Sequence, residues 1–254
     1  MKYSVLTYNI AGYEIIHNIP DDCINPEIEY IYVTDDHSIT SNTWTVVYAD
    51  DLTGSTFDKC YQIRFDPFRF CHTDIVMRID GSMAINKDVM PLFKRFEEGD
   101  FDCAMMIHPT RNTMYDEYVT WVSQRGYPKT EAEKSLNFMA ANGYDVMNYK
   151  GLFQGNFSIQ RKNDIVLRSN AETYQVLKML ATEPETIHRI DQTIWTFVIN
   201  THYPDLKIMP VGQYICFHHY FNWCVHNTDR VMYYDGRNNT EPFMRNEPTT
   251  IWYV

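Results

Sequence analysis

The sequence lacks several features that mark common functional classes. It has no run of Lys or Arg, and its net charge of −11 argues against a general nucleic-acid binder, which would show a basic face. No apolar stretch approaches the ~20 residues needed to cross a bilayer, and the first residues do not resemble a signal peptide. The six cysteines form no CxxC pair or other metal-ligand spacing. We therefore expect a cytoplasmic protein with free thiols, and peripheral membrane association stays open.

The 254 residues also contain no internal repeat, no low-complexity segment and no Pro/Gly/Ser linker. Hydrophobic residues make up 44% of the chain, which is enough for a substantial core. We expect a single domain over residues 1–254, with a strand-rich first half (1–112) and a more helical second half (113–254).

Hydrophobic patterning predicts an α/β protein. Apolar, β-branched and aromatic runs predict strands over 3–8, 28–33, 44–48, 75–80, 102–107, 155–160 and 213–217. Apolar residues at helical spacing predict helices near 88–99, 115–122, 130–143, 170–181 and 190–198. Strand–helix alternation in the first half implies a mainly parallel, Rossmann-like sheet flanked by helices.

Polar residues follow four of the predicted strands at their carboxyl ends. In a parallel sheet these ends share one edge, where open α/β folds bind ligands. We therefore expect one crevice to collect the residues that follow these strands: Thr7, Asn9, Asp35, Asp36, Asp80, Gly81, Ser82, His108 and Arg111.

Asp80 stands out because it ends a buried strand and precedes Gly81, which lets a bulky ligand approach the backbone. Its carboxylate could hold Mg²⁺ or Mn²⁺ against a diphosphate, since hard cations prefer oxygen ligands. Asp35 or Asp36 could bind ribose hydroxyls or a base. The alternative for all three acids is an ordinary turn or cap.

Other candidates follow from residue chemistry. Arg111 could clamp a phosphate through its guanidinium, and His108 could bind a phosphate or a sugar hydroxyl. Asp191, which begins a predicted helix, is either a general base for an acceptor hydroxyl or a helix-terminal acid. Of the adjacent His218 and His219, one could join Asp80 as a metal or phosphate ligand, because neighbouring strand residues face opposite sides.

With these residues described, the chain resembles GT-A-type glycosyltransferases, in particular a glycosyltransferase-like family once described as a domain of unknown function, with plant and bacterial members. The resemblance is carried by short segments in the family's order, covering about four-fifths of the chain: 6–13, 32–36, 77–82, 106–111, 151–156 and 189–192.

This resemblance implies transfer of a sugar from a nucleotide-diphosphate donor, such as a UDP-sugar, to a hydroxyl of a glycan or polysaccharide. Residues 1–112, with Tyr13 among them, would bind the nucleotide, and residues 113–254 would form the acceptor side. Asp80 would occupy the metal-binding Asp-x-Asp position. The acceptor-side residues would be Gln154, Gly155, Asn156 and Gln192.

One position departs from the family pattern, because Ser82 stands where these enzymes commonly carry a second acid. Either Asp80 with a histidine holds the metal, or Arg and His residues act without one. Two other functions stay open. One is a non-catalytic protein that binds nucleotides or sugars, and the other is a metal-dependent phosphohydrolase that uses Asp35, Asp36, Asp80 and histidines.

Overall fold

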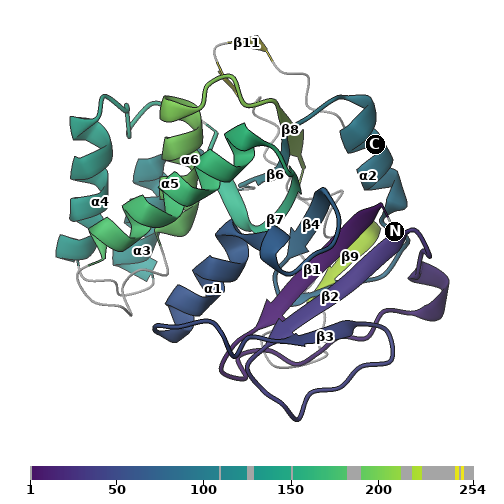
Figure 1. Cartoon of the computed structure of the whole chain (residues 1–254). Helices are drawn as coiled ribbons and strands as arrows, with labels where there is room; N and C mark the ends of the chain where they lie inside the picture. Colours follow the sequence, from purple (N-terminus) through teal and green to yellow (C-terminus); the bar gives the residue numbers. More distant parts are fainter. Residues whose placement is uncertain are drawn as a thin grey trace.

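The computed structural model describes residues 2–108, 110–124, 129–149, 151–181, 190–212, 219–224, 244–245 and 247–248. In this part of the chain a sheet of seven strands forms the centre of the molecule, in the order β3-β2-β1-β4-β7-β6-β8 (Figure 1). Its strands are β1 (Tyr3–Asn9), β2 (Ile28–Thr34), β3 (Thr45–Tyr48), β4 (Ile75–Ile79), β6 (Cys103–Ile107), β7 (Phe153–Arg161) and β8 (Ile208–Val211).

The direction of each strand decides which strand ends lie at the same edge of the sheet. The strands β1 to β4 pair in parallel, whereas β7 is antiparallel to both β4 and β6, and β8 is again parallel to β6. Six strands therefore point their carboxyl ends toward one edge, and β7 begins at that same edge. The predicted α/β class with a mainly parallel sheet is confirmed.

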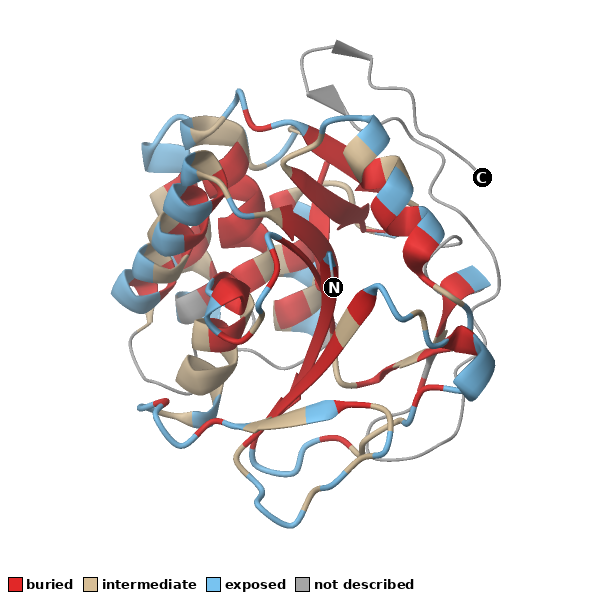
Figure 2. Ribbon diagram, turned by 45° about the vertical axis from the view of Figure 1, so that its right-hand side comes forward, coloured by how far each residue is buried: buried red, intermediate tan, exposed pale blue. Residues whose placement is uncertain are grey.

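Helices cover both faces of the sheet unequally. One face packs against α1 (Thr56–Phe65), α3 (Met114–Gln124), α4 (Lys129–Ala141), α5 (Asp164–Leu180) and α6 (Asp191–His202). The other face packs against α2 (Met90–Glu98) and the small sheet of β5 (Met83–Ile85) with β9 (Phe221–Trp223). Figure 2 shows the central strands buried and exposed residues on the outer sides of the helices. None of the described helices is long and apolar enough to cross a membrane.

The remaining elements are short. Two single turns of 3₁₀ helix, η1 (Asp21–Cys23) and η2 (Pro67–Arg69), lie in loops, and β10 (Met244–Arg245) pairs with β11 (Glu247–Pro248).

One predicted helix needs correction, and one predicted strand is not tested by the structure. The helix predicted to start at Asn170 begins instead at Asp164, because the Asn163 side chain caps it by accepting from Val166 N at 3.0 Å. Asn170 then lies inside α5, where its amide donates to Gln160 Oε1 at 2.7 Å. The strand predicted over 213–217 lies outside the described residues.

The helix α1 was not predicted, although its start carries a local signal. Ser55 Oγ accepts a hydrogen bond from Asp58 N at 3.2 Å, which is the contact of an N-terminal cap. Its buried residues Tyr61, Ile63 and Phe65 do not form the regular apolar stripe of a surface helix. One side of α1 faces a pocket instead.

Candidate functional site

A pocket of about 750 Å³ opens at the carboxyl edge of the sheet, between the ends of β1 and β4. Its lining comes from the end of β1 and the loop that follows it, from one side of α1, and from residues 80–82 after β4. The α1 residues that line it are Thr56, Phe57, Cys60, Tyr61 and Arg64. Successive positions in this set lie one or three residues apart, so a single helix side faces the cavity.

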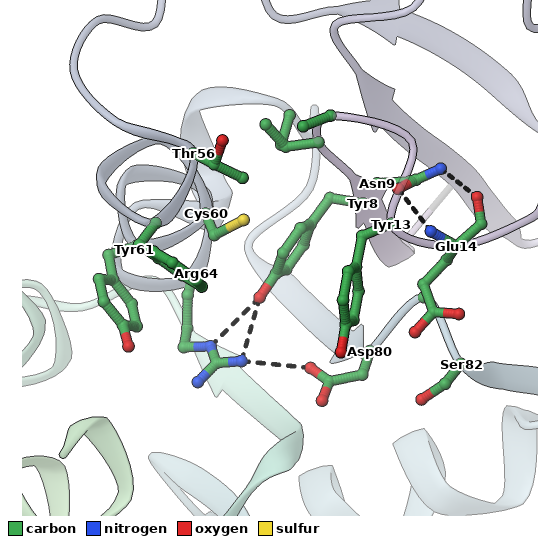
Figure 3. Close-up of a pocket in the computed structure, with 14 residues that line it drawn as sticks. Tyr8, Asn9, Tyr13, Glu14, Thr56, Cys60, Tyr61, Arg64, Asp80 and Ser82 are labelled. Atoms are coloured by element: carbon green, nitrogen blue, oxygen red, sulfur yellow. Dashed lines mark hydrogen bonds and ion pairs between the residues drawn. The ribbon is translucent and has the colours of Figure 1, made fainter. Parts of the chain in front are cut away.

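The loop after β1 is clasped by the Asn9 side chain. Its amide donates to Glu14 O, and Glu14 N donates back to Asn9 Oδ1 at 2.9 Å. Inside this clasp Ala11 and Gly12 adopt left-handed φ angles of 60° and 66°. The turn presents Tyr13, 63% exposed, at the pocket (Figure 3). The clasp therefore places an aromatic ring beside the cavity, although the ring itself is accessible.

Asp80 is held at the pocket by two arginines. Its Oδ1 accepts from Arg78 Nη1 at 2.9 Å and from Arg64 Nη2 at 3.3 Å. Its backbone N donates to Asn156 O at 2.9 Å, which joins the end of β4 to the beginning of β7. Arg78 is 1% exposed, whereas about a third of the Asp80 side chain is accessible. The carboxylate thus faces the cavity from a rigid, positively charged support.

Arg64 links Asp80 to a second acid. Its guanidinium forms a buried ion pair with Asp191, the first residue of α6. It also donates to Tyr8 Oη from Nε at 3.3 Å and from Nη2 at 3.1 Å (Figure 3). Burial opposes its charged form, but Tyr8 and Asp80 outweigh burial and raise the pKa of Arg64. Burial raises the pKa of Tyr8, although Arg64 opposes the shift. The pocket therefore contains a permanent cation beside a neutral phenol.

Two glycines allow these groups to approach closely. A Cβ on Gly155 would lie 2.9 Å from Asp191 Oδ2 and 3.0 Å from Arg64 Nη1. A Cβ on Gly81 would lie 2.9 Å from Tyr8 O and 3.1 Å from Glu14 Cγ. Real Cβ atoms essentially never approach other atoms within 3.0 Å, so any side chain at either position would force these neighbouring groups to move.

A break in strand pairing brings Gly155 to this place. The register of β6 with β7 shifts between Met105, which pairs with Ser158, and Met106, which pairs with Gln154. Residues 155–157 therefore leave the ladder with β6, as at a β-bulge, which re-aims local side chains. As a result Gly155 packs against α6 and α1.

A second cluster of polar residues, joined by hydrogen bonds and an ion pair, extends from the pocket toward the end of β6. Glu117, fully buried on α3, accepts from Trp121 Nε1 and from Gln192 Nε2 at 2.9 Å each, and pairs with Arg111 Nε at 2.7 Å. Arg111 also bonds the ring of His108, and Gln192 Oε1 accepts from Gly155 N at 2.9 Å. Glu117 thus connects His108 and Arg111, which follow β6, to Gln192 and through it to Gly155.

Ten of the predicted site residues line the pocket or are joined to it by contacts. Asn9, Tyr13, Asp80, Gly81 and Ser82 line the pocket. Asp191, Gly155, Gln192, Arg111 and His108 join it through the contacts above.

The remaining candidates lie outside the pocket lining. Asp35 lies behind the loop, where Oδ1 accepts from Ala11 N at 2.8 Å and Oδ2 pairs with Lys59 at 3.4 Å. Asp36 is exposed, and its carboxylate accepts hydrogen bonds from the backbone N and the hydroxyl of Ser38. This contact is that of an ordinary turn, which the sequence analysis gave as the alternative to ligand binding. Thr7 is buried within β1.

The four other acceptor-side and metal candidates have different outcomes. Gln154 and Asn156 are buried, and Gln154 Oε1 and both polar side-chain atoms of Asn156 have no hydrogen-bond partner among the described residues. His219 is exposed and its ring contacts Tyr220 edge-on. His218 lies outside the described residues.

The structure also identifies residues that the sequence patterns did not indicate. Tyr8, Glu14, Arg64 and Arg78 contact or surround Asp80, and Glu117 connects the second cluster. Arg78 carried a weak signal, since a charged residue in the buried strand before Asp80 requires a partner. Arg64 carried none, because its helix was not predicted.

The residues around Asp80 are a poor fit for a divalent cation. Its Oδ1 already accepts from two guanidinium groups, and both positive charges lie where they would repel a metal ion. Ser82 offers a hydroxyl in place of a second acid. The described residues contain no group of three or more His, Cys, Asp or Glu side chains that could hold a metal.

Comparison of the sequence with protein-family models and with curated proteins finds no match. Among solved structures, the chain is similar to mouse xyloside xylosyltransferase 1 in its apo form, with 11% identity over 83% of this chain and 85% of that chain and a TM-score of 0.46. It is also similar to the bifunctional glycosyltransferase WbbM, with 16% identity over 78% of this chain and a TM-score of 0.49. That alignment spans only 37% of the WbbM chain.

Proposed function

We propose that this protein is a glycosyltransferase that transfers a sugar from a nucleotide-diphosphate donor to a hydroxyl of a glycan or polysaccharide. The observation that carries the proposal is the pocket at the carboxyl edge of β1 and β4, where Asp80, Arg64 and Asp191 are joined in one ion-pair network. Its volume of about 750 Å³ suits a ligand of nucleotide-sugar size.

The donor would occupy the part of the pocket formed by residues 1–112. Tyr13 would pack against the nucleoside, Asn9 and Asp35 would hold the loop that carries Tyr13, and the Gly81 backbone would admit the donor close to Asp80. Thr7 and Asp36 would contribute less, because neither lines the cavity. Asp80 would bind hydroxyls of the donor sugar, oriented by its two arginines.

The acceptor would approach over β7 and α6. Buried amides of Gln154 and Asn156 offer hydrogen-bonding groups, and Gln192 holds the Gly155 backbone beside Asp191. We assign Asp191 as the general base for the acceptor hydroxyl. His108 and Arg111 would support this side through Glu117.

A metal-independent reaction fits this site better than the Mn²⁺ or Mg²⁺ expected at Asp80, because the two arginines already supply the positive charge. We propose that the protein acts in the cytoplasm and that its acceptor is a glycan. The arrangement favours transfer over phosphate hydrolysis by metal-bound water, which would need the acid and histidine cluster that the described residues do not form.

The proposal is tested first by thermal shift with UDP, GDP and dTDP, each with Mn²⁺ and with EDTA. Release of nucleoside diphosphate from a panel of sugar nucleotides, in the presence of glycan acceptors, then measures transfer. We expect Asp80→Asn to abolish transfer, while Asp205→Asn, an exposed acid between α6 and β8, leaves it intact. Transfer by Asp80→Asn at the normal rate, or nucleotide binding by no member of the panel, would refute the proposal.

A further inference from the structure

The bulge of β7 is held by side chains at the point where it leaves β6. Gly155 N donates to Gln192 Oε1 at 2.9 Å, and Gly155 O accepts a hydrogen bond from Arg78 Nη2. Gly155 is buried, and a buried backbone group without a partner costs about as much free energy as a lost hydrogen bond. The position of Gly155 therefore depends on where these two side chains lie.

Arg78 transmits the position of Gly155 to Asp80. One guanidinium group donates from Nη2 to Gly155 O and from Nη1 to Asp80 Oδ1, the latter at 2.9 Å. The group is planar, and its donors form a rigid fork. Arg78 is also only 1% exposed, so water does not replace a lost partner easily. A movement of the Gly155 carbonyl would therefore turn the guanidinium plane and shift the nitrogen that holds Asp80.

The orientation of the Gln192 amide is set by Glu117. Gln192 Nε2 donates to Glu117 Oε1 at 2.9 Å, and a carboxylate accepts hydrogen bonds but donates none. The NH₂ group of Gln192 must therefore face Glu117, which leaves its oxygen to face Gly155 N. Glu117 is itself fixed by Arg111 Nε at 2.7 Å and by Trp121 Nε1 at 2.9 Å.

We infer that Glu117 and Gln192 are positioning residues for Asp80, acting through the Gly155 backbone and Arg78. The inference rests on the proposed function and deepens it. Glu117 lies on α3 and does not line the pocket, yet it determines which atom of Gln192 holds the bulge. The side chain that would bind the donor sugar is thus oriented by a carboxylate from another part of the fold.

Exchanging the two side chains tests this order of donors and acceptors. In Glu117→Gln the new carbonyl is taken by Arg111 and Trp121, so the new NH₂ group faces Gln192. Gln192 must then turn its oxygen toward residue 117 and its NH₂ group toward Gly155 N, where two donors oppose each other. In Gln192→Glu two carboxylates face each other at hydrogen-bond distance.

The double variant Glu117→Gln/Gln192→Glu restores the pattern. The amide at 117 donates to the carboxylate at 192, and that carboxylate accepts from Gly155 N. The number of acids is the same as in the unaltered protein. Arg111 still lacks its carboxylate, so the free energy of unfolding should stay below that of the unaltered protein even where turnover recovers.

Steady-state transfer is measured at a temperature at which every variant is folded. We expect each single variant to lower kcat by about 10- to 100-fold, the loss that a misplacement of about 1 Å produces. The double variant should recover most of this loss. UDP should bind all variants normally in titration calorimetry, because it lacks the sugar that Asp80 would hold. Glu133→Gln, the same change at a half-buried glutamate of α4 that pairs with Lys129, is the matched control and should leave turnover unchanged.

The amide proton of Gly155 gives a second readout that does not depend on turnover. Its NMR resonance and its rate of hydrogen exchange report the bond to Gln192 directly. We expect faster exchange in Glu117→Gln and a return toward the original rate in the double variant.

The outcomes separate the two proposals. Normal turnover in either single variant, or a double variant whose turnover falls by the product of the two single losses, overturns the inference while the proposed function stands. If the unaltered protein transfers no sugar from any donor of the panel, the proposed function fails and this inference fails with it. Loss in both single variants with recovery in the double variant supports the positioning role, because a purely structural role predicts no recovery of turnover without recovery of stability.

Discussion

Replacing Gly155 by alanine tests the close packing of the site with a single added methyl group. The new Cβ would lie 2.9 Å from Asp191 Oδ2, 3.0 Å from Arg64 Nη1 and 3.3 Å from Gln192 Cγ. Ordinary van der Waals contact begins at 3.4 Å, so all three neighbours must move. These neighbours belong to the ion pair that holds α6 against α1 and to the hydrogen bond that holds α6 against β7.

The expected magnitude follows from overpacking of a buried site. Inserting a methyl group into a filled space costs about 1–3 kcal/mol, and the charged neighbours place this case in the upper part of that range. An opposing gain of about 0.4–1 kcal/mol arises because alanine restricts the unfolded chain more than glycine does. We therefore expect Gly155→Ala to lower the free energy of unfolding by about 1–2 kcal/mol and to abolish transfer.

Gly212→Ala is the matched control. Among the described residues no atom lies within 4 Å of the Cβ that it would add, and its φ is not left-handed, so only the gain from the unfolded chain applies. Urea denaturation gives both free energies of unfolding, and nucleotide titration gives both affinities. If Gly155→Ala matches Gly212→Ala in stability and in nucleotide binding, the close approach of Asp191, Arg64 and β7 is wrong.

Three further predictions concern the supporting structure. Glu117→Gln keeps the shape of the buried side chain but leaves Arg111 without its carboxylate, so urea denaturation should show a loss of about 3 kcal/mol; an unchanged midpoint would contradict the pairing. Gly81→Ala, whose Cβ would meet Tyr8 O at 2.9 Å, should weaken nucleotide binding in the same titration, and normal affinity would show that the Asp80 turn does not need its glycine. The pKa of Glu29 is lowered because hydrogen bonds from His72 and Ser4 outweigh the effect of burial. A carboxyl group whose pKa is lowered by folding contributes its full stabilisation above 4.5, its value in the unfolded chain, and this contribution is lost as the pH falls through the folded value. The free energy of unfolding should therefore decrease less steeply with falling pH in Glu29→Gln than in the unaltered protein.

Much of the architecture followed from local patterns. Runs such as 28–33 and 75–80 are continuous apolar segments because parallel strands are buried on both faces, and they lie within one residue of β2 and β4. The position of Asp80 at the carboxyl end of β4 follows directly from that pattern. Helix α2 was also readable, since Leu92, Phe93 and Phe96 share one buried side and Gly99 ends it.

Other elements are harder to predict from the sequence. The helix α1 begins with a capping contact but devotes one side to a pocket, so its apolar residues do not follow the usual period. The direction of β7 was equally hidden, because an antiparallel strand inserted between β4 and β6 has the same local composition as a parallel one. Its bulge at residues 155–157 depends on register with β6, which no local pattern specifies.

The sequence by itself determined the α/β class, the main strands and the placement of Asp80 and its neighbours at one edge of the sheet. These properties depend on hydrophobic burial within a few consecutive residues, which local spacing records. Only the tertiary structure decided that Arg64 pairs with Asp191, 127 residues away, and that Gly155 lies against both. Such contacts depend on strand order, strand direction and helix packing, and each residue contributes to them without a signature in its own neighbourhood.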